Sequence, residues 1–259
     1  MVGMASRDTL LEMWHRELTT APEGWDFSAL DGRMSEDAAP WDFDAVCRVE
    51  LERSRHLLDM GTGGGEQLMG FGEALPKDTV ATEGWAPNVP VAARNLEPHG
   101  IPVLDWDADR EPPVPMPFGN GRFDLVLNRH ESYDVPEIVR VISPGGVFLT
   151  QQVGSDDARE TMDWFGGTST RRTDWQLTFG QAQVESAGLV VERAEEWRGV
   201  YEFEDVTALM GYFSIVPWDL PEGFTVAAQA DALWRLHEQA ESGSIRLTKS
   251  RWMILARRS

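Results

Sequence analysis

The sequence predicts an α/β fold in which a mostly parallel β-sheet carries helices on both faces, and three observations support this prediction. Residues 57–66 change from an apolar strand to a glycine-rich turn that opens a helix. Short apolar strands at residues 79–82 and 123–128 alternate with helical segments. Residues 138–150 combine a helix end, a Pro-Gly-Gly turn and another strand. Strands that alternate with helices are typical of a parallel sheet, and 259 residues suffice for one such domain.

The N-terminal 55 residues precede the first predicted strand. Residues 6–18 carry apolar side chains at helical spacing, with Ser6 or Asp8 as the candidate N-cap. Tryptophans and phenylalanines follow among Asp, Gly and Pro, and residues 44–55 form a second, polar helix. We interpret residues 1–55 as a helical lid over the ligand site. The alternative, that these aromatic side chains simply pack against the sheet, stays open.

The glycine turn after the first strand is the strongest indication of a ligand site. Gly61, Gly63 and Gly65 leave no side chain between the backbone and a ligand, and glycine adopts the positive φ angles that such turns need. The spacing is G-x-G-x-G followed by Glu66, and a carboxylate at the helix start would repel a diphosphate. The turn therefore favours S-adenosylmethionine, which carries ammonium and sulfonium groups, over NAD.

Residues 57–65 resemble the first motif of the class I S-adenosylmethionine-dependent methyltransferases, apolar-apolar-Asp-x-Gly-x-Gly-x-Gly. The resemblance implies a Rossmann-like, seven-stranded, mostly parallel sheet whose last strand is antiparallel. It also implies S-adenosylmethionine as the cofactor. Its methionine and ribose portion would lie at Asp59 and the glycine turn, including Thr62.

The second strand, residues 79–82, ends at Glu83, which lies 18 residues beyond Gly65. A carboxylate at this place can accept hydrogen bonds from both ribose hydroxyls. Gly84 and Trp85 follow directly, and the Trp85 ring can cover the adenine or the ribose. A role for Trp85 in the core is the alternative.

The third strand, residues 100–104, leads into Asp105-Trp-Asp-Ala108. In the methyltransferase family, an acidic residue here binds the adenine amino group. The resemblance assigns this contact to Asp107 and places Ala108 against the adenine ring, with Asp105 as the rival for the contact.

The fourth and fifth strands also match landmarks of the family. Residues 123–128 begin with the family's Phe-Asp-Leu-Val entry, and the Pro-Gly-Gly turn within residues 138–150 precedes the fifth strand. Ligands in an open α/β sheet bind beyond the carboxyl ends of the strands. The end of the fourth strand, at Asn128, is therefore expected beside the cofactor.

Residues 128–134 concentrate ionisable side chains where the transferred methyl group should lie. Methyl transfer requires an aligned nucleophile and, if the nucleophile is protonated, a base. His130 is the candidate base because its unperturbed pKa lies near neutrality, and Glu131 can orient it, replace it or bind a cationic substrate. A purely structural His130 is the alternative. Gln151 and Gln152, at the end of the fifth strand, are candidates for hydrogen bonds to a substrate or else polar edge residues.

The remainder of the chain completes the predicted domain. We expect a helix over residues 156–165, a link over 166–172, a helix over 179–187, a sixth strand over 189–197, an inserted segment over about 199–240 that ends in a helix over 225–240, and an antiparallel strand over 250–256. We therefore divide a single domain into the lid, a cofactor-binding half over residues 56–155 and a substrate-side half over 156–259.

Charge and composition limit the partners. The 23 Lys and Arg residues stand against 43 Asp and Glu residues, giving a formal net charge of −20, and such a field repels nucleic acid. We therefore predict methyl transfer to a small molecule. An RNA methyltransferase is one alternative. A cofactor-binding protein, or an enzyme that uses the sulfonium for cyclisation or elimination, is another.

Cysteine content, hydropathy and histidine spacing indicate the cellular compartment and whether a membrane span or a metal site is expected. Cys47 is the single cysteine and is expected in the core of a cytoplasmic protein. No long apolar run indicates a membrane span, and the scattered histidines predict no metal site. The acceptor atom and the oligomeric state do not follow from the sequence.

Overall fold

The computed structural model describes residues 6–20, 25–168 and 172–259, and the chain forms two compact units. The first, here called the helical unit, contains Met1–Ala39, Ser155–Asp174 and Arg198–Ser250. The second, here called the sheet unit, contains Pro40–Gly154, Trp175–Trp197 and Arg251–Ser259. The chain passes between the two units several times, so neither unit is a continuous segment. Residues 169–171, in the predicted link, lie outside the described residues.

The strands follow the order β1-β7-β8-β6-β5-β2-β3-β4. Their bounds are β1 Met34–Glu36, β2 His56–Met60, β3 Asp78–Glu83, β4 Val103–Asp105, β5 Phe123–Arg129, β6 Ile142–Val153, β7 Leu189–Phe203 and β8 Ile245–Arg258. The five strands from β2 to β6 pair in parallel, and β8 pairs antiparallel with β6. The predicted mostly parallel sheet with an antiparallel last strand is confirmed.

Within the described residues, the sheet has eight strands instead of the seven expected from the resemblance. The additional strand is β1, whose three residues pair antiparallel with β7, from Met34 opposite Phe203 to Glu36 opposite Tyr201. Its sequence, Met-Ser-Glu, is too short to show the apolar alternation that marks a strand. The same pairing explains why β7 continues to Phe203 and does not end at Trp197.

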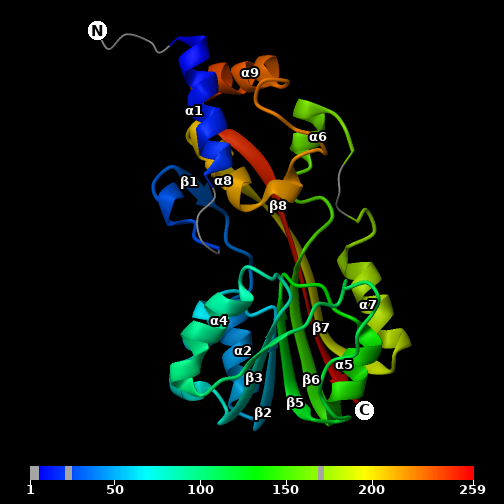
Figure 1. Ribbon diagram of the computed structural model, residues 1–259. Helices are drawn as coiled ribbons and strands as arrows, with labels where there is room; N and C mark the ends of the chain where they lie inside the picture. The colour runs from blue at the N-terminus through cyan, green and yellow to red at the C-terminus, as the bar shows by residue number, and fades with distance from the viewer. Residues whose placement is uncertain (1–5, 21–24, 169–171) are drawn as a thin grey trace. The chain divides into compact units, whose positions relative to one another are not determined.

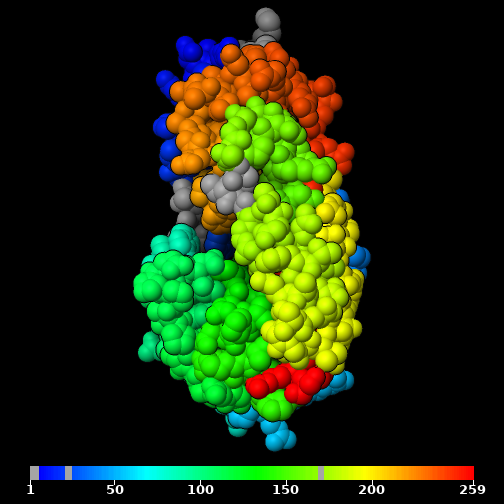
Figure 2. All heavy atoms as spheres, turned by 90° about the vertical axis from the view of Figure 1, so that its right-hand side faces the viewer, coloured from blue at the N-terminus to red at the C-terminus, as the bar shows by residue number. Residues whose placement is uncertain are grey.

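Helices cover both faces of the sheet in the sheet unit (Figure 1). In Figure 1, α2 (Phe43–Leu51) and α4 (Val89–Leu96) lie on one side, and α5 (Val135–Val141) and α7 (Leu177–Ser186) lie on the other. Figure 2 shows α7 at the surface in yellow-green. The core between the sheet, α5 and α7 includes Val126, Ile138, Phe148, Val184 and Ile254, all fully buried. Cys47, on α2, is buried as predicted.

The Phe-Asp-Leu-Val entry of β5 has a structural explanation. The Asp124 carboxylate accepts hydrogen bonds from the Ser54 hydroxyl (2.6 Å) and from the backbone N–H groups of Arg55 (3.0 Å) and His56 (3.1 Å). These donors belong to the turn that leads from α2 into β2. Asp124 therefore fixes the entry of the strand that carries the glycine turn.

The helical unit packs around its own apolar core. Its helices are α1 (Arg7–Thr19), α6 (Glu160–Phe165), α8 (Val206–Ile215) and α9 (Ala230–Ala240). Helix α8 is buried over most of its surface, which suits its almost wholly apolar sequence. The Ser6 hydroxyl accepts a hydrogen bond from the Thr9 N–H, so Ser6, not Asp8, caps α1.

Several element bounds differ from those predicted. Helix α6 begins at Glu160 instead of residue 156, α9 at Ala230 instead of 225, and α2 ends at Leu51 instead of 55. Strand β4 begins at Val103 because Gly100 has a positive φ of 70° and Pro102 lacks an N–H for the ladder. Strand β8 begins at Ile245, five residues before the predicted start at residue 250. Within the described residues, no helix has the length and apolar character that crossing a membrane requires.

Candidate functional site

The glycine turn joins β2 to the short helix α3 (Glu66–Met69). Gly61, Gly63 and Gly65 have φ angles of 66°, 62° and 87°, so all three glycines have the positive φ that the sequence predicts. The turn is fixed at both ends. The Thr62 N–H donates to the Thr82 carbonyl oxygen on β3 at 3.0 Å, and the Gly65 N–H donates to the Thr62 carbonyl oxygen at 2.9 Å.

Glu131 lies directly against this turn. A Cβ atom placed on Gly61 would lie 2.4 Å from Glu131 Cβ and 2.5 Å from Glu131 Cγ, closer than real contacts allow. The absence of a side chain at Gly61 therefore makes room for Glu131. The structure brings the segment after β5 onto the glycine turn, as expected for neighbouring parallel strands that end at one edge of a sheet.

Glu83 ties the end of β3 to the same turn. The residue is 3% exposed, and its carboxylate accepts hydrogen bonds from the Gly63 N–H (2.7 Å) and the Trp85 N–H (2.9 Å), one on each oxygen. A carboxylate oxygen has more than one lone pair, so each retains capacity for a hydroxyl donor. Trp85 itself is 48% exposed, which excludes the core role that was its alternative.

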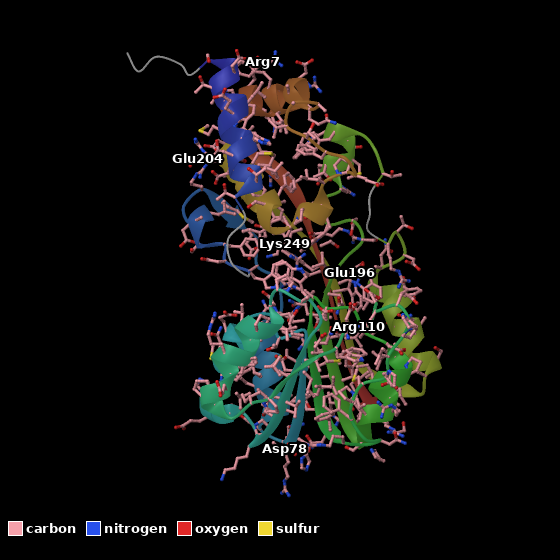
Figure 3. The ribbon with its side chains drawn as sticks, viewed as in Figure 1. Arg7, Asp78, Arg110, Glu196, Glu204 and Lys249 are labelled. Carbon is pink, nitrogen blue, oxygen red and sulfur yellow. The ribbon has the colours of Figure 1, made fainter. Side chains whose placement is uncertain are left out.

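The end of β4 distinguishes the two aspartates that compete for the adenine contact. Asp105 forms an ion pair with Arg110. Asp107 instead packs near Gly84, where an added Cβ would lie 2.9 Å from Asp107 Cβ. Figure 3 shows Arg110 well separated from Asp78, the first residue of β3, so the Asp105–Arg110 ion pair lies away from the beginning of β3. Asp105 is the register partner of Glu83 in the sheet, but the Asp107 side chain packs beside Gly84 and its charge acts on Glu83. Ala108 follows it partly buried.

The carboxyl groups at this end of the sheet hold their protons unusually strongly. Burial, with the neighbouring Glu83 carboxylate, raises the pKa of Asp59 to about 7 against the opposing effects of Thr62 and Arg129. Burial, with Glu83, Asp107 and Asp109, raises the pKa of Glu131 to about 8. Burial also raises the pKa of Glu83. Carboxylates that repel one another in a low-dielectric site are stabilised by a cation, so this arrangement suits a positively charged ligand.

Asn128, the residue before the last of β5, lies within a buried polar network. Its Oδ1 accepts hydrogen bonds from the Thr150 hydroxyl (2.8 Å) and from Gln152 Nε2 (2.5 Å), and Gln152 Nε2 also donates to the Glu131 carbonyl oxygen at 2.9 Å. Asn128 is completely buried, and its Nδ2 has no hydrogen-bond partner among the described residues. A buried donor of this kind is costly unless a ligand or water accepts from it.

Gln151 and Gln152 were candidates for substrate contacts, and the structure places both in internal hydrogen bonds. The Gln151 side chain is 6% exposed and lies between the Trp41 indole and the exposed His130. No pattern in the sequence indicates the contact of Trp41 with Gln151, because the two residues lie 110 positions apart along the chain. Over the described residues, no group of three or more His, Cys, Asp and Glu side chains is arranged to hold a metal ion.

No protein-family model matches the chain, and no curated protein matches it. Among solved structures, a “putative methyltransferase” from Bacillus halodurans is similar with a TM-score of 0.59 at 19% identity, covering 83% of this chain and 98% of that chain. The YcgJ protein from Bacillus subtilis has a TM-score of 0.59 at 16% identity, covering 83% of this chain and 97% of that chain.

A third solved structure, the [4+2]-cyclase SpnF, is similar over 100% of this chain and 97% of that chain, with a TM-score of 0.54 at 18% identity. At these identities the likeness concerns the fold. This chain's sheet is mostly parallel, with an antiparallel β8, as the resemblance to the methyltransferase family implies. The chain therefore has the class I, Rossmann-like methyltransferase fold.

Proposed function

We propose that the protein is an S-adenosylmethionine-dependent methyltransferase that acts on a small molecule. The observation that supports this most strongly is the convergence of Asp59, Glu83 and Glu131 on a glycine turn, in a fold that methyltransferases use. The ammonium and sulfonium groups of the cofactor would relieve the repulsion among these carboxylates.

Each portion of the cofactor has residues that fit it. The glycine turn and Asp59 would hold the methionine portion, where glycines alone permit a close approach. The Glu83 carboxylate would accept the ribose hydroxyls while its backbone hydrogen bonds keep it in place. Asp107 would accept the adenine amino group, with Ala108 and the exposed Trp85 ring as apolar surfaces.

The bound cofactor would supply an electrophilic methyl group, so the protein mainly has to align the acceptor with it. Glu131 lies against the turn, within the electrostatic influence of the Glu83 carboxylate, where it can stabilise positive charge or accept a proton from the acceptor. The formal net charge of −20 favours a small-molecule acceptor over RNA.

Isothermal titration with S-adenosylhomocysteine tests the cofactor assignment. We expect binding by the wild type, and a loss of about 1–3 kcal/mol in Glu83→Gln because hydrogen bonds to the ribose are lost. Glu73→Gln is the matched control, since this exposed glutamate makes the same charge change and should leave affinity unchanged. Equal affinities in the two variants would contradict the role of Glu83, and no heat with the wild type would contradict the cofactor itself.

The [4+2]-cyclase among the similar structures shows that this fold is not restricted to methyl transfer. Mass spectrometry of reactions with S-adenosylmethionine and a panel of small acceptors separates the outcomes. S-adenosylhomocysteine with a methylated acceptor supports the proposal. Methylthioadenosine indicates elimination or cyclisation and contradicts methyl transfer.

A further inference from the structure

The side chains of Trp41, Gln151 and His130, from separate parts of the sheet unit, are connected by hydrogen bonds. Trp41 Nε1 lies 2.7 Å from Gln151 Oε1, and Gln151 Nε2 lies 3.2 Å from His130 Nε2. Trp41 and Gln151 are each 6% exposed. Trp41 precedes α2, Gln151 is on β6 and His130 follows β5.

The chemistry of these groups fixes the direction of each hydrogen bond. An indole nitrogen only donates, so the atom of Gln151 that faces Trp41 must be the amide oxygen. The amide nitrogen then faces His130, and an amide nitrogen also only donates. His130 Nε2 must therefore accept, which requires that it carry no proton. We infer that Trp41 and Gln151 hold His130 as the neutral Nδ1–H tautomer, which makes His130 a hydrogen-bond donor and not a base.

The backbone holds His130 in the same place. Its φ of 61° is unusual for a residue other than glycine, and its N–H donates to the Gln151 carbonyl oxygen at 2.8 Å. Gln151 thus binds both the backbone and the ring of His130. A side chain that is held through two such contacts loses the freedom to turn its ring and present Nε2 elsewhere, so Trp41 and Gln151 are positioning residues.

The neutral tautomer gives His130 and Glu131 different roles in the site, a consequence that rests on the proposed methyl transfer. With Nε2 accepting from Gln151, His130 cannot remove a proton from the acceptor through this nitrogen. The neighbouring Glu131, which lies against Gly61, is then the group that can accept a proton.

Nitrogen NMR of protein labelled with ¹⁵N-histidine tests the tautomer without any ligand or activity. Two-bond ¹H–¹⁵N spectra distinguish the Nδ1–H form, the Nε2–H form and the imidazolium. The chain has five histidines, and the His130→Gln variant identifies the signal of His130 by its loss. We expect the Nδ1–H pattern for His130 at neutral pH and above. An Nε2–H pattern would overturn the inference.

Two variants of the positioning residues make the test specific. In Gln151→Glu, both carboxylate oxygens accept, so Nε2 must gain a proton and the spectrum should change to the Nε2–H or imidazolium pattern. In Trp41→Phe, the indole donor is gone and the fraction of the Nε2–H form should rise. The exposed His99 serves as the internal reference that neither variant should move. If His130 keeps its wild-type pattern in Trp41→Phe, the chain from Trp41 does not set the tautomer. Since no cofactor is used, these results are independent of the titration with S-adenosylhomocysteine.

Discussion

Gly61 and His130 both have positive φ angles at the edge of the sheet, but their surroundings differ. Gly61 faces Glu131 so closely that a side chain has no room, whereas His130 keeps a side chain despite the cost of its backbone conformation. A non-glycine residue in this region costs roughly 1–2 kcal/mol. Such strain is found where the surrounding contacts over-determine the conformation, as Gln151 does at His130.

The close contact between Gly61 and Glu131 predicts the effect of a single methyl group. Gly61→Ala should lower the free energy of unfolding by about 1–2 kcal/mol for the positive φ and by about 1–3 kcal/mol more for overpacking. Gly100→Ala, with a φ of 70° and nothing within 4 Å of an added Cβ, should show only the first effect. Urea denaturation measures both, and equal losses would contradict the contact. Glu131→Gly added to Gly61→Ala should recover part of the loss.

The strain at His130 predicts a reversal of the usual order of alanine and glycine. His130→Gly should be more stable than His130→Ala by about 1 kcal/mol, because only alanine retains the cost of the left-handed backbone. At the neighbouring Arg129, within β5, the order should be the ordinary one, with glycine less stable than alanine. Thermal or urea unfolding of the four variants measures this, and the same order at both positions would be evidence against the strain.

At the scale of elements, Asp124 shows how one side chain supports the site from the opposite end of its strand. It binds the turn that leads into β2, and β2 carries the glycine turn. Asp124→Ala should lower the free energy of unfolding by about 1–3 kcal/mol because three donors lose a charged acceptor. Ser54→Ala removes only one of these hydrogen bonds and should cost less. Guanidinium denaturation compares the two, and an equal cost would contradict the account.

The sequence predicted the elements that have a local signal. The glycine turn has its own residue pattern, and β2, β3 and β5 are apolar strands of ordinary length, so these elements could be predicted. The structure confirms their places and their parallel pairing. The three-residue β1 and the outer parts of β7 and β8 were not predicted because long-range pairing and packing determine them. The same reason hid the contact of Trp41 with Gln151. Glu83 could be proposed from its position after a predicted strand, and Asp107 from the family resemblance; both roles stay predictions.

At the scale of the whole molecule, the buried carboxyl groups make the stability of the fold depend on pH. Folding raises the pKa of Asp59 to about 7 and that of Glu131 to about 8, from about 4 in an unfolded chain. Their contribution to stability is therefore complete below about pH 4 and is lost as the pH rises through about 7 and 8. The described fold should be less stable at pH 8 than at pH 5 unless a cation is bound.

This pH dependence can be assigned to the two groups by substitution. The double variant Asp59→Asn, Glu131→Gln should lose much less stability than the wild type between about pH 5 and pH 8. The control Asp31→Asn, Glu73→Gln makes the same charge change at exposed positions and should keep the wild-type dependence. Urea denaturation across this range provides the measurement. Identical slopes in the two double variants would show that net charge alone is responsible.

The central claim is that the acidic glycine turn at the carboxyl ends of β2 and β3 binds an adenosyl sulfonium cofactor. The most direct measurement is a crystal structure of the protein grown with saturating S-adenosylhomocysteine. The claim predicts electron density for the compound over Gly61 to Gly65, with the ribose hydroxyls on Glu83 and the adenine amino group at Asp107. Density for the compound at another place, or a well-ordered turn with Glu131 filling the space and no compound bound, would contradict it.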